Sequence, residues 1–403
     1  MTTAYQRQRA VHAFSFIHRA VARRIQAAEP TQSVRPIELP TRNNHPRTAR
    51  LAVPCRLKMH ARLFLQRLSP STRRETVLRS AQRDIEPLSV KPPTQINTLH
   101  PRNRHQGRYD FPSLIRADAA LGDFVRVNAQ GEPGIDFADP AAVKALNRAL
   151  LQHSYGILGW DIPPQNLCPP VPGRADYVHY LADLLAASNR GVIPQTRTVQ
   201  VLDIGTGANC IYPLIGHSEY GWDFVATDIN AASLANAQAI LDSNPKLAKH
   251  ITLRLQDTAT AIFKGVVFDA DWFDLTLCNP PFHASLADAS AGTQRKWHNL
   301  GKHAADPGLN FGGQDAELWC AGGEQAFIQR MIRESTTLPT RAFWFSTLVS
   351  KSASLPGIYA ALKHAQVQTH HTIAMRQGKK QSRLVAWTFL NPAQQAAWRK
   401  LRW

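Results

Sequence analysis

The feature that most limits the fold of this chain is a regular alternation of apolar strand-like runs and amphipathic helical runs from residue 198 onward. Seven runs are typical of buried strands: Val199–Ile204, Phe224–Asp228, Ile251–Leu255, Phe273–Cys278, Ala342–Val349, Val367–Met375 and Arg383–Leu390. Helical runs lie among them at Ala231–Asp242, Glu324–Ser335 and Ala353–His364. Because this alternation is typical of strands joined by crossover helices, the sequence predicts an α/β protein with a doubly wound, seven-stranded sheet.

Two helices are predicted before the first strand. Asp136–Leu151 is entered through an N-cap aspartate followed by proline, and Ala175–Ala187 has an amphipathic pattern. We therefore expect a small helical portion over residues 100–197 and an α/β core over residues 198–403. Inside the core, residues 284–323 lack a regular period. A segment of that length is typically a functional loop, so we expect it to serve the substrate.

The positive charge is concentrated in the first quarter of the chain. The 403 residues carry 47 basic and 29 acidic side chains, a net charge of +18. Residues 1–99 alone hold 18 basic and five acidic side chains, a net of +13, which leaves +5 for residues 100–403. This composition predicts a mostly disordered basic extension. Three interpretations of it stay open: a nucleic-acid-binding arm, a transit peptide, or sequence upstream of the true translation start.

Several classes of protein and site are disfavoured. No run of 18 apolar residues occurs, so we expect no membrane span. The five cysteines are far apart and form no CxxC pair, which argues against a disulfide framework and for a reducing compartment, the cytoplasm. We find no convincing Ser-His-Asp or Cys-His unit. We also expect no metal, because the histidines of the long loop, His283, His298 and His303, lack cysteine partners and helical spacing.

The first motif with chemistry is the strand end Val201–Gly207, VLDIGTG. Gly205 and Gly207 let the backbone approach a ligand or adopt positive φ. A dinucleotide fingerprint needs a third glycine where this chain has Cys210, so a pyrophosphate site is disfavoured. Asp203, placed just before the turn, suits a ligand with a charged amino-acid moiety. A purely structural strand-to-helix turn is the alternative.

Asp228 ends the next predicted strand, 21 residues after Gly207. A carboxylate at the end of the neighbouring strand can accept hydrogen bonds from a ribose diol. It can also simply cap the helix that follows.

The motif Asn279-Pro280-Pro281-Phe282, directly after a predicted strand, is much more specific. Two prolines at a strand end fix a rigid turn. Asn279 presents a neutral carbonyl acceptor, and together with a proline carbonyl it can hold both hydrogens of a planar amino group. Phe282 offers a face on which a flipped base can stack. The pattern therefore predicts methylation of an amino group by direct transfer from a sulfonium donor, carried by positioning and electrostatics.

Together these motifs resemble the class I S-adenosylmethionine-dependent methyltransferases that act on exocyclic amines. Longer stretches are similar to the bacterial 23S rRNA adenine-N6 methyltransferase family RlmF: His100–Asp110, Asp161–His179, Asp203–Gly216, Cys278–His283, Leu309–Gly323 and Gln377–Phe389. The resemblance covers about residues 100–392 and leaves residues 1–99 outside it. It implies the class I, Rossmann-like fold, and methylation of the N6 amine of adenine 1618 in 23S rRNA or in a large-subunit assembly intermediate.

The resemblance also implies roles for the matched positions. The S-adenosyl-L-methionine pocket would be formed by Arg174 at the methionine carboxylate, Asp203, Gly205, Gly207, Asp228 at the ribose, and Gln256 and Asp257 near the adenine. The target-base site would be Asn279, Pro280, Pro281 and Phe282. Contacts to RNA would come from Arg102, Asn103, Arg104, Lys379, Lys380 and Arg383. For the two lysines, a solvated surface is an equal alternative.

Two other functions stay open on the sequence. The same turn could act on DNA adenine or on a protein glutamine amide, since each offers a planar amino group. DNA enzymes usually carry a separate recognition domain, and glutamine-directed ones generally have tyrosine where this chain has Phe282. A non-catalytic RNA-binding protein with a decayed methyltransferase fold is the more distant alternative.

Overall fold

The computed structural model describes residues 99–194, 199–283, 319–377 and 380–403. The predicted basic extension, most of the long loop and Lys379 lie outside these residues. The helices are α3 (Phe111–Ala117), α4 (Pro140–Tyr155), α5 (Val171–Ser188), α6 (Ile211–Tyr220), α7 (Ala231–Asp242), α8 (Pro245–Ala248), α11 (Gly323–Ser335), α12 (Leu355–His364) and α13 (Pro392–Arg402), with short 3₁₀ helices at Ala119–Phe124 and Ser352–Ser354. The main-sheet strands are β3 (Gln200–Ile204), β4 (Asp223–Asp228), β5 (Ile251–Leu255), β6 (Phe273–Cys278), β7 (Ala342–Val349), β8 (Thr369–Gln377) and β9 (Lys380–Thr388).

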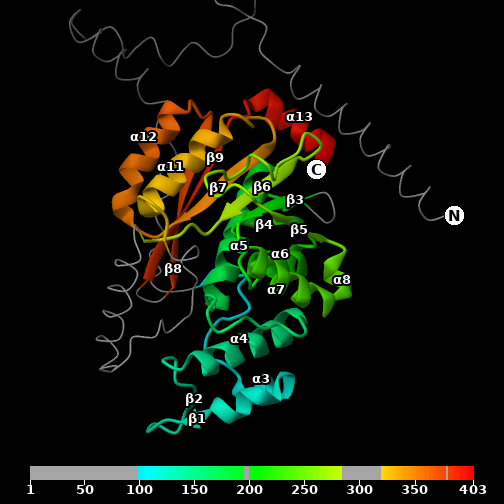
Figure 1. Ribbon diagram of the computed structural model, residues 1–403, viewed down its shortest axis with the longest axis vertical. Helices are drawn as coiled ribbons and strands as arrows, with labels where there is room; N and C mark the ends of the chain where they lie inside the picture. The colour runs from blue at the N-terminus through cyan, green and yellow to red at the C-terminus, as the bar shows by residue number, and fades with distance from the viewer. Residues whose placement is uncertain (1–98, 195–198, 284–318, 378–379) are drawn as a thin grey trace, which may run out of the picture. The chain divides into compact units, whose positions relative to one another are not determined.

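The seven strands form one sheet in the order β5-β4-β3-β6-β7-β9-β8 (Figure 1). The first five are parallel, and β9 runs antiparallel to both of its neighbours. A separate two-stranded ribbon pairs β1 (Arg126–Val127) with β2 (Pro133–Gly134). The predicted doubly wound, seven-stranded α/β sheet is therefore confirmed.

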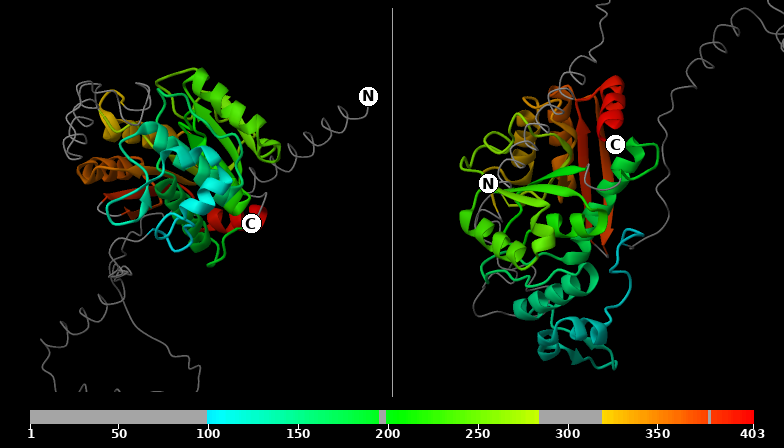
Figure 2. Two further views of the ribbon diagram at one scale, coloured as in Figure 1. Left: turned by 90° about the horizontal axis from the view of Figure 1, so that it is seen from below. Right: turned by 90° about the vertical axis from the view of Figure 1, so that its right-hand side faces the viewer.

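Helices cover both faces of the sheet. Successive side chains of a strand point to opposite faces, so each buried strand contributes apolar side chains to two separate cores. Val201 and Leu275 belong to the core that α4, α5, α6 and α7 share. Leu202 and Phe345 belong to the second core, under α11 and α12. Figure 1 and the right-hand view of Figure 2 place α3 and α4 at one end, below the sheet.

Local sequence signals explain several helix boundaries. Asp139 caps α4 by accepting a hydrogen bond from the Ala141 N–H at 2.8 Å, and Gly156 ends that helix in the left-handed conformation. Helix α4 begins four residues after the predicted start, at Pro140, where this cap places it. Among the described residues, no helix is both long and apolar enough to cross a membrane.

The strand register determines where the functional side chains meet. Asp203 pairs with Ala226 on β4, and Ile204 pairs with Cys278 on β6. The carboxyl ends of β4, β3 and β6 therefore lie side by side. In doubly wound sheets ligands bind at this edge. The glycine turn, Asp228 and the turn that begins at Asn279 all follow from these three strand ends.

Candidate active site

A cavity of about 420 Å³ opens at the carboxyl ends of β3, β4 and β6. This volume is typical of a site for a small molecule or cofactor. Its lining comes from the glycine turn, the ends of β4 and β6, the first turn of α5, the loop after β5, and the chain around α11. The predicted residues among the lining are Arg174, Gly205, Gly207, Asp228, Gln256, Asn279 and Pro281.

The glycine turn after β3 is held against β4 by backbone hydrogen bonds. Gly205 and Gly207 have φ values of +74° and +65°, which favour glycine over other residues. The N–H groups of Gly205 and Thr206 both donate to the Thr227 carbonyl at 2.9 Å. The Gly207 N–H donates to Asp228 Oδ2 at 2.8 Å. Asp228 thus stabilises the turn while its carboxylate lines the cavity.

Cys210 occupies the place at which a dinucleotide fingerprint has its third glycine. The structure shows it buried and left-handed, with φ of +49° and ψ of +30°, at the N-cap of α6. The backbone therefore adopts here the conformation that glycine provides at no steric cost.

Asp203 lies behind the glycine turn and is not part of the cavity lining. Its side chain is 0% exposed, and neither carboxylate oxygen has a hydrogen-bond partner within the described residues. Burial is the main cause that raises the pKa of Asp203 to about 7; the Asp228 charge adds to it, and Thr206 and the Arg174 charge oppose it. A buried carboxyl of this kind favours a positively charged group in the cavity beside it.

Arg174 reaches the cavity from the first turn of α5. Its Nη1 donates to the Tyr212 hydroxyl at 3.0 Å, and its guanidinium lies 5.5 Å from the centroid of the Tyr212 ring. No carboxylate of the described residues pairs with Arg174. This guanidinium can therefore receive the carboxylate of a ligand.

Gln256 and Asp257, both predicted near an adenine, have different surroundings. Gln256 is buried and lines the cavity, where its Nε2 donates to the Lys264 carbonyl at 2.9 Å and its Oε1 accepts from the Thr258 N–H at 3.1 Å. Asp257 is exposed, accepts from the Thr258 hydroxyl at 3.0 Å, and is not among the lining residues. The structure therefore supports a ligand role for Gln256 and not for Asp257.

The Asn-Pro-Pro-Phe turn lines the cavity through Asn279 and Pro281 and carries an unused acceptor. Asn279 Oδ1 is buried and has no hydrogen-bond partner among the described residues. Pro281 also lines the cavity, whereas Pro280 is buried beside it and Phe282 is half-buried outside the lining. The Phe282 carbonyl accepts from Lys351 Nζ at 3.1 Å, which ties the turn to the end of β7. An acceptor left free at this depth indicates a ligand donor.

The opposite wall was not predicted residue by residue. Trp319, Phe327 and Arg330 line it, and Trp319 Nε1 and Arg330 Nε are buried without partners in the described residues. The chain reaches this wall because Trp319 pairs with His283 as an isolated bridge, and the Cys320 N–H donates to the His283 carbonyl at 3.1 Å. The sequence signals for it were the predicted helix Glu324–Ser335, which carries Phe327 and Arg330, and the stretch Leu309–Gly323, matched by resemblance.

The arm predicted to contact RNA binds mainly to the protein itself. Asn103 is only 3% exposed, and its amide donates to Asp176 and to the Pro172 carbonyl, so its prediction as an RNA contact is wrong for this structure. Arg102 and Arg104 are partly exposed but form ion pairs with Asp183 and Glu219 at 2.7 Å each. Both can still present guanidinium edges to a phosphate.

The C-terminal basic residues lie on the hairpin of β8 and β9. Arg383 pairs in register with Val349 on β7 and with Ala374 on β8, and its side chain is half-buried. Lys380 begins β9, opposite Gln377. Arg383 is not among the residues that line the cavity. Their predicted contacts to RNA stay predictions.

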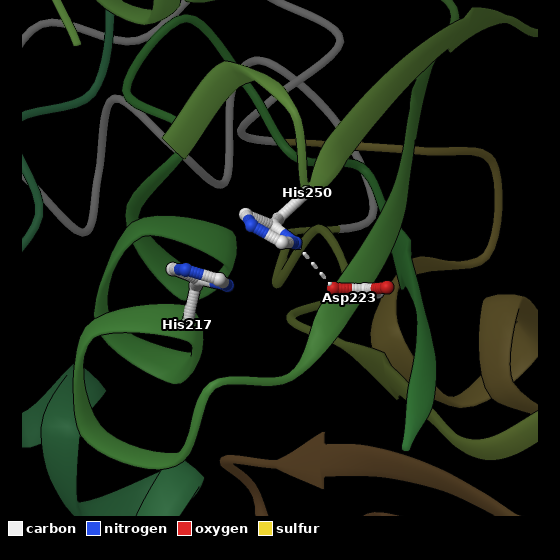
Figure 3. A group of neighbouring side chains, drawn as sticks. All are labelled: His217, Asp223 and His250. Atoms are coloured by element: carbon white, nitrogen blue, oxygen red, sulfur yellow. Dashed lines mark hydrogen bonds and ion pairs between the residues drawn. The ribbon is translucent and has the colours of Figure 1, made fainter. Parts of the chain in front are cut away.

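A separate cluster lies at the amino-terminal edge of β4 and β5. His217, Asp223 and His250 approach within 4.8 Å of one another through metal-ligand atoms (Figure 3). His217 Nδ1 donates to the Trp222 carbonyl at 2.9 Å, and His250 Nδ1 bonds Asp223 Oδ1 at 2.8 Å. The two rings stack at 4.3 Å and 22°. Imidazole lone pairs lie in the ring plane, so stacked rings direct them side by side and not at one ion.

The residues around the cavity fit S-adenosylmethionine. Arg174, which pairs with no carboxylate of the described residues, can receive the carboxylate of the cofactor, and the buried Asp203 favours the positive charge of the sulfonium. Asp228 lies at the strand end where a ribose diol is bound in doubly wound folds. Asn279 adds a free acceptor next to this place. The arrangement can therefore bind a charged nucleoside and present an amino group to it.

Comparisons with known proteins show the family of this chain. A family model described as RNA methyltransferase matches residues 94–391. Ribosomal RNA large subunit methyltransferase F of Pseudomonas paraeruginosa is 56% identical over 329 residues, covering 80% of this chain and 96% of that protein. The protein of the same name from Methylobacillus flagellatus is 55% identical over 327 residues, covering 77% of this chain and 97% of that protein.

Solved structures show the same fold. The hMettl16 catalytic domain in complex with MAT2A 3′UTR hairpin 1 is 29% identical with a TM-score of 0.60, covering 73% of this chain and 97% of that one. The N-terminal domain of human METTL16 in complex with SAH is 27% identical with a TM-score of 0.57, covering 73% and 99%. Family model, relatives and fold agree: the chain belongs to the RNA methyltransferase family that includes ribosomal RNA large subunit methyltransferase F.

Proposed function

We propose that this protein transfers a methyl group from S-adenosyl-L-methionine to the N6 amine of adenine 1618 in 23S rRNA. The observation that carries the proposal is the buried, unpartnered Oδ1 of Asn279 in a cavity shared with the glycine turn and Arg174. The relatives named ribosomal RNA large subunit methyltransferase F support large-subunit rRNA as the substrate. The position of the adenine and the N6 atom rest on the resemblance in sequence.

The cofactor half of the cavity binds and orients the methyl donor. S-adenosylmethionine supplies an electrophilic methyl group on a sulfonium. Arg174 binds the carboxylate of its methionine part, and Asp228 accepts hydrogen bonds from the ribose hydroxyls. Gln256, which lines the cavity, would lie near the adenine. Because these three residues come from separate elements around one cavity, they hold the donor in a single orientation.

The target half acts through hydrogen bonds to the amine. An adenine N6 amine is a weak nucleophile, since its lone pair is delocalised into the ring. Asn279 Oδ1 accepts one N6 hydrogen and the Pro280 carbonyl accepts the other, which draws the nitrogen toward tetrahedral geometry. Asn279 is neutral and takes no proton, so the proton leaves N6 for solvent after the transfer. Phe282 provides the face on which the flipped base stacks.

The proposal also names the parts of the chain that would contact the RNA substrate. Residues 100–197 and the partly exposed guanidinium groups of Arg102 and Arg104 would contact the RNA, with Arg383 and the two lysines beside it. The substrate would be 23S rRNA or a large-subunit assembly intermediate in the cytoplasm. DNA adenine and protein glutamine amides remain the alternatives that share the chemistry.

An Asn279→Ala variant tests the chemical assignment. Calorimetry should show S-adenosylhomocysteine binding within about twofold of wild type, because Asn279 does not hold the cofactor. Transfer of labelled methyl to rRNA should fall by about 10²-fold or more, since one preorganised hydrogen-bond partner is lost. Lys400→Ala, at an exposed position on α13 outside the cavity, serves as a control. Full activity of Asn279→Ala would contradict the assignment.

The substrate is tested separately. Labelled donor is incubated with naked rRNA, ribosomal particles, duplex DNA or a release factor. The proposal expects incorporation only with the first two. Methylation of DNA or of a glutamine amide would instead establish one of the alternatives.

A further inference from the structure

The arm His100–Arg104 is joined to the start of α5 by buried hydrogen bonds. The Asn103 amide donates to Asp176 Oδ1 and, at 2.8 Å, to the Pro172 carbonyl. The His100 N–H donates to the same oxygen of Asp176 at 2.9 Å. Asp176 is 1% exposed, so these donors replace water for a carboxyl group inside the protein. Burial raises the pKa of Asp176, and the bonds from Asn103 and His100 oppose that rise.

These two anchor points flank the arginine that lines the cavity. Pro172 and Asp176 each lie two residues from Arg174, so Asn103 bridges the turn of α5 that carries the guanidinium. The arginine then extends to Tyr212 in the first turns of α6. A small rotation of this turn would displace the guanidinium at the end of a long side chain.

The two arginines on either side of Asn103 bind α5 and α6 closer to the C-terminal ends of these helices. Arg102 donates to Asp183 and to the His179 carbonyl on α5, and its Nε donates to Tyr220 on α6 at 2.9 Å. Arg104 holds Glu219 on α6 through two nitrogens. The arm therefore spans both helices whose opposite ends bring Arg174 and Tyr212 together.

We propose that Asn103 is a positioning residue for the cofactor: by holding the first turn of α5 it places Arg174 for the methionine carboxylate. The inference rests on the proposed function, since it assumes that Arg174 binds this carboxylate. Burial gives Asn103 no surface for RNA. Loss of its amide leaves the Asp176 carboxylate with one donor fewer and frees the carbonyl of Pro172, so the turn is no longer held in one place.

The test compares two ligands that differ at the carboxylate. S-adenosylhomocysteine carries the amino-acid part, and 5′-methylthioadenosine lacks it. Calorimetry on the full chain, well below the unfolding temperature, should show that Asn103→Ala weakens binding of the first by about tenfold and of the second by less than about twofold. Asn103→Ser, which keeps a small donor, should fall between wild type and Asn103→Ala. Arg108→Ala is the matched control, because this exposed arm residue pairs with Glu132 and not with α5.

A double-mutant cycle separates positioning from general stability. Asn103→Ala should add almost nothing to the loss caused by Arg174→Ala, since both act on one contact. If Asn103→Ala weakened the binding of both ligands equally, the inference would be overturned. It would also be overturned if Asn103→Ser lowered the melting temperature but left both affinities unchanged. Neither result would contradict the proposed function. A wild-type protein that binds neither ligand would overturn the proposed function, and the inference with it.

Discussion

Single side chains at the strand ends determine what the cavity can bind. Arg174 is a cation without a carboxylate partner in the described residues, and Asn279 is an acceptor without a donor. Asp203 is a fully buried carboxyl group, and neither of its oxygens has a hydrogen bond of normal geometry within the described residues. Unused polar groups of this kind reduce the stability of a protein that holds nothing in its cavity. Their joint presence is therefore explained by a ligand whose carboxylate pairs with Arg174 and whose positive charge lies near Asp203.

The buried Asp203 predicts a pH-dependent stability. The pKa of this carboxyl is about 7 in the folded protein, against an ordinary value of about 3.9 in an unfolded chain. The folded state thus holds the proton more tightly. Below about pH 4 the Asp203 carboxyl is protonated in both states and its ionisation does not lower the free energy of unfolding. As the pH rises from about 4 to about 7, the unfolded chain ionises first and the free energy of unfolding falls. Asp203→Asn should remove this loss, which is on the order of 2–4 kcal/mol at pH 8.

Urea unfolding without ligand at pH 5 and pH 8 measures this effect. The variant should gain stability relative to wild type on going from pH 5 to pH 8. Asp257→Asn, at an exposed aspartate beside the same sheet edge, is the control and should show no such gain. An Asp203→Asn difference that is the same at both pH values would contradict the buried, uncompensated state of this carboxyl.

At the scale of elements, the last helix is fastened to the sheet through one buried carboxylate. Asp274 on β6 is 0% exposed and accepts hydrogen bonds from Trp398 and Trp403 at 2.7 and 2.8 Å. Arg402 pairs with it at 2.8 Å, and the Gln200 N–H donates to it at the start of β3. The site strands β3 and β6 are thus anchored at the end opposite the cavity.

Removal of Arg402 should therefore be strongly destabilising. Arg402→Ala leaves the buried Asp274 charge without its cation, at a cost of about 3–5 kcal/mol in the free energy of unfolding. Asp274→Asn in the same background should restore part of the loss, because the uncompensated charge is gone. Lys400→Ala, at an exposed position on α13, is the control. Denaturant unfolding measures all three, and an Arg402→Ala protein as stable as the control would disprove the anchor.

Elements with a strong apolar period could be predicted from the sequence, and irregular ones could not. The limits of β5, β6 and β7 agree with prediction because these strands begin and end with their apolar runs. Helix α6 was given no limits, since Pro213 and Gly216 interrupt its pattern. The structure shows why glycine is there: a Cβ on Gly216 would overlap the Phe224 ring. Strand β9 begins before its apolar run, because the hairpin with β8 continues to Lys380 through backbone pairing.

Some residues of the site could likewise be predicted from the sequence and others could not. Residues in short motifs at strand ends, such as Asp228 and Asn279, could be placed from sequence because parallel strands end at one edge. Trp319 could not, since it follows a long segment that has no period. Arg330 could not, since its helix α11 was predicted but nothing in the sequence linked that helix to the cavity. Asn103 was assigned to RNA through the resemblance of its arm to the family. Only the fold reveals that its side chain points into the protein toward Asp176.

At the scale of the whole molecule, the net charge of +18 is a poor guide to the RNA surface. Residues 100–403, which contain the family match almost entirely, carry only +5. Several of their arginines are held by acidic partners, such as Arg104 by Glu219. Recognition of RNA by this portion therefore rests on local groups and on the base site, not on a general positive field.

The most direct test of the account is a map of N6-methyladenosine in 23S rRNA from cells that lack the gene. The account predicts that adenine 1618 is unmodified in these cells, that the wild-type gene restores the modification, and that an Asn279→Ala gene does not. Persistence of the modification in the deleted strain, or full restoration by Asn279→Ala, would contradict it.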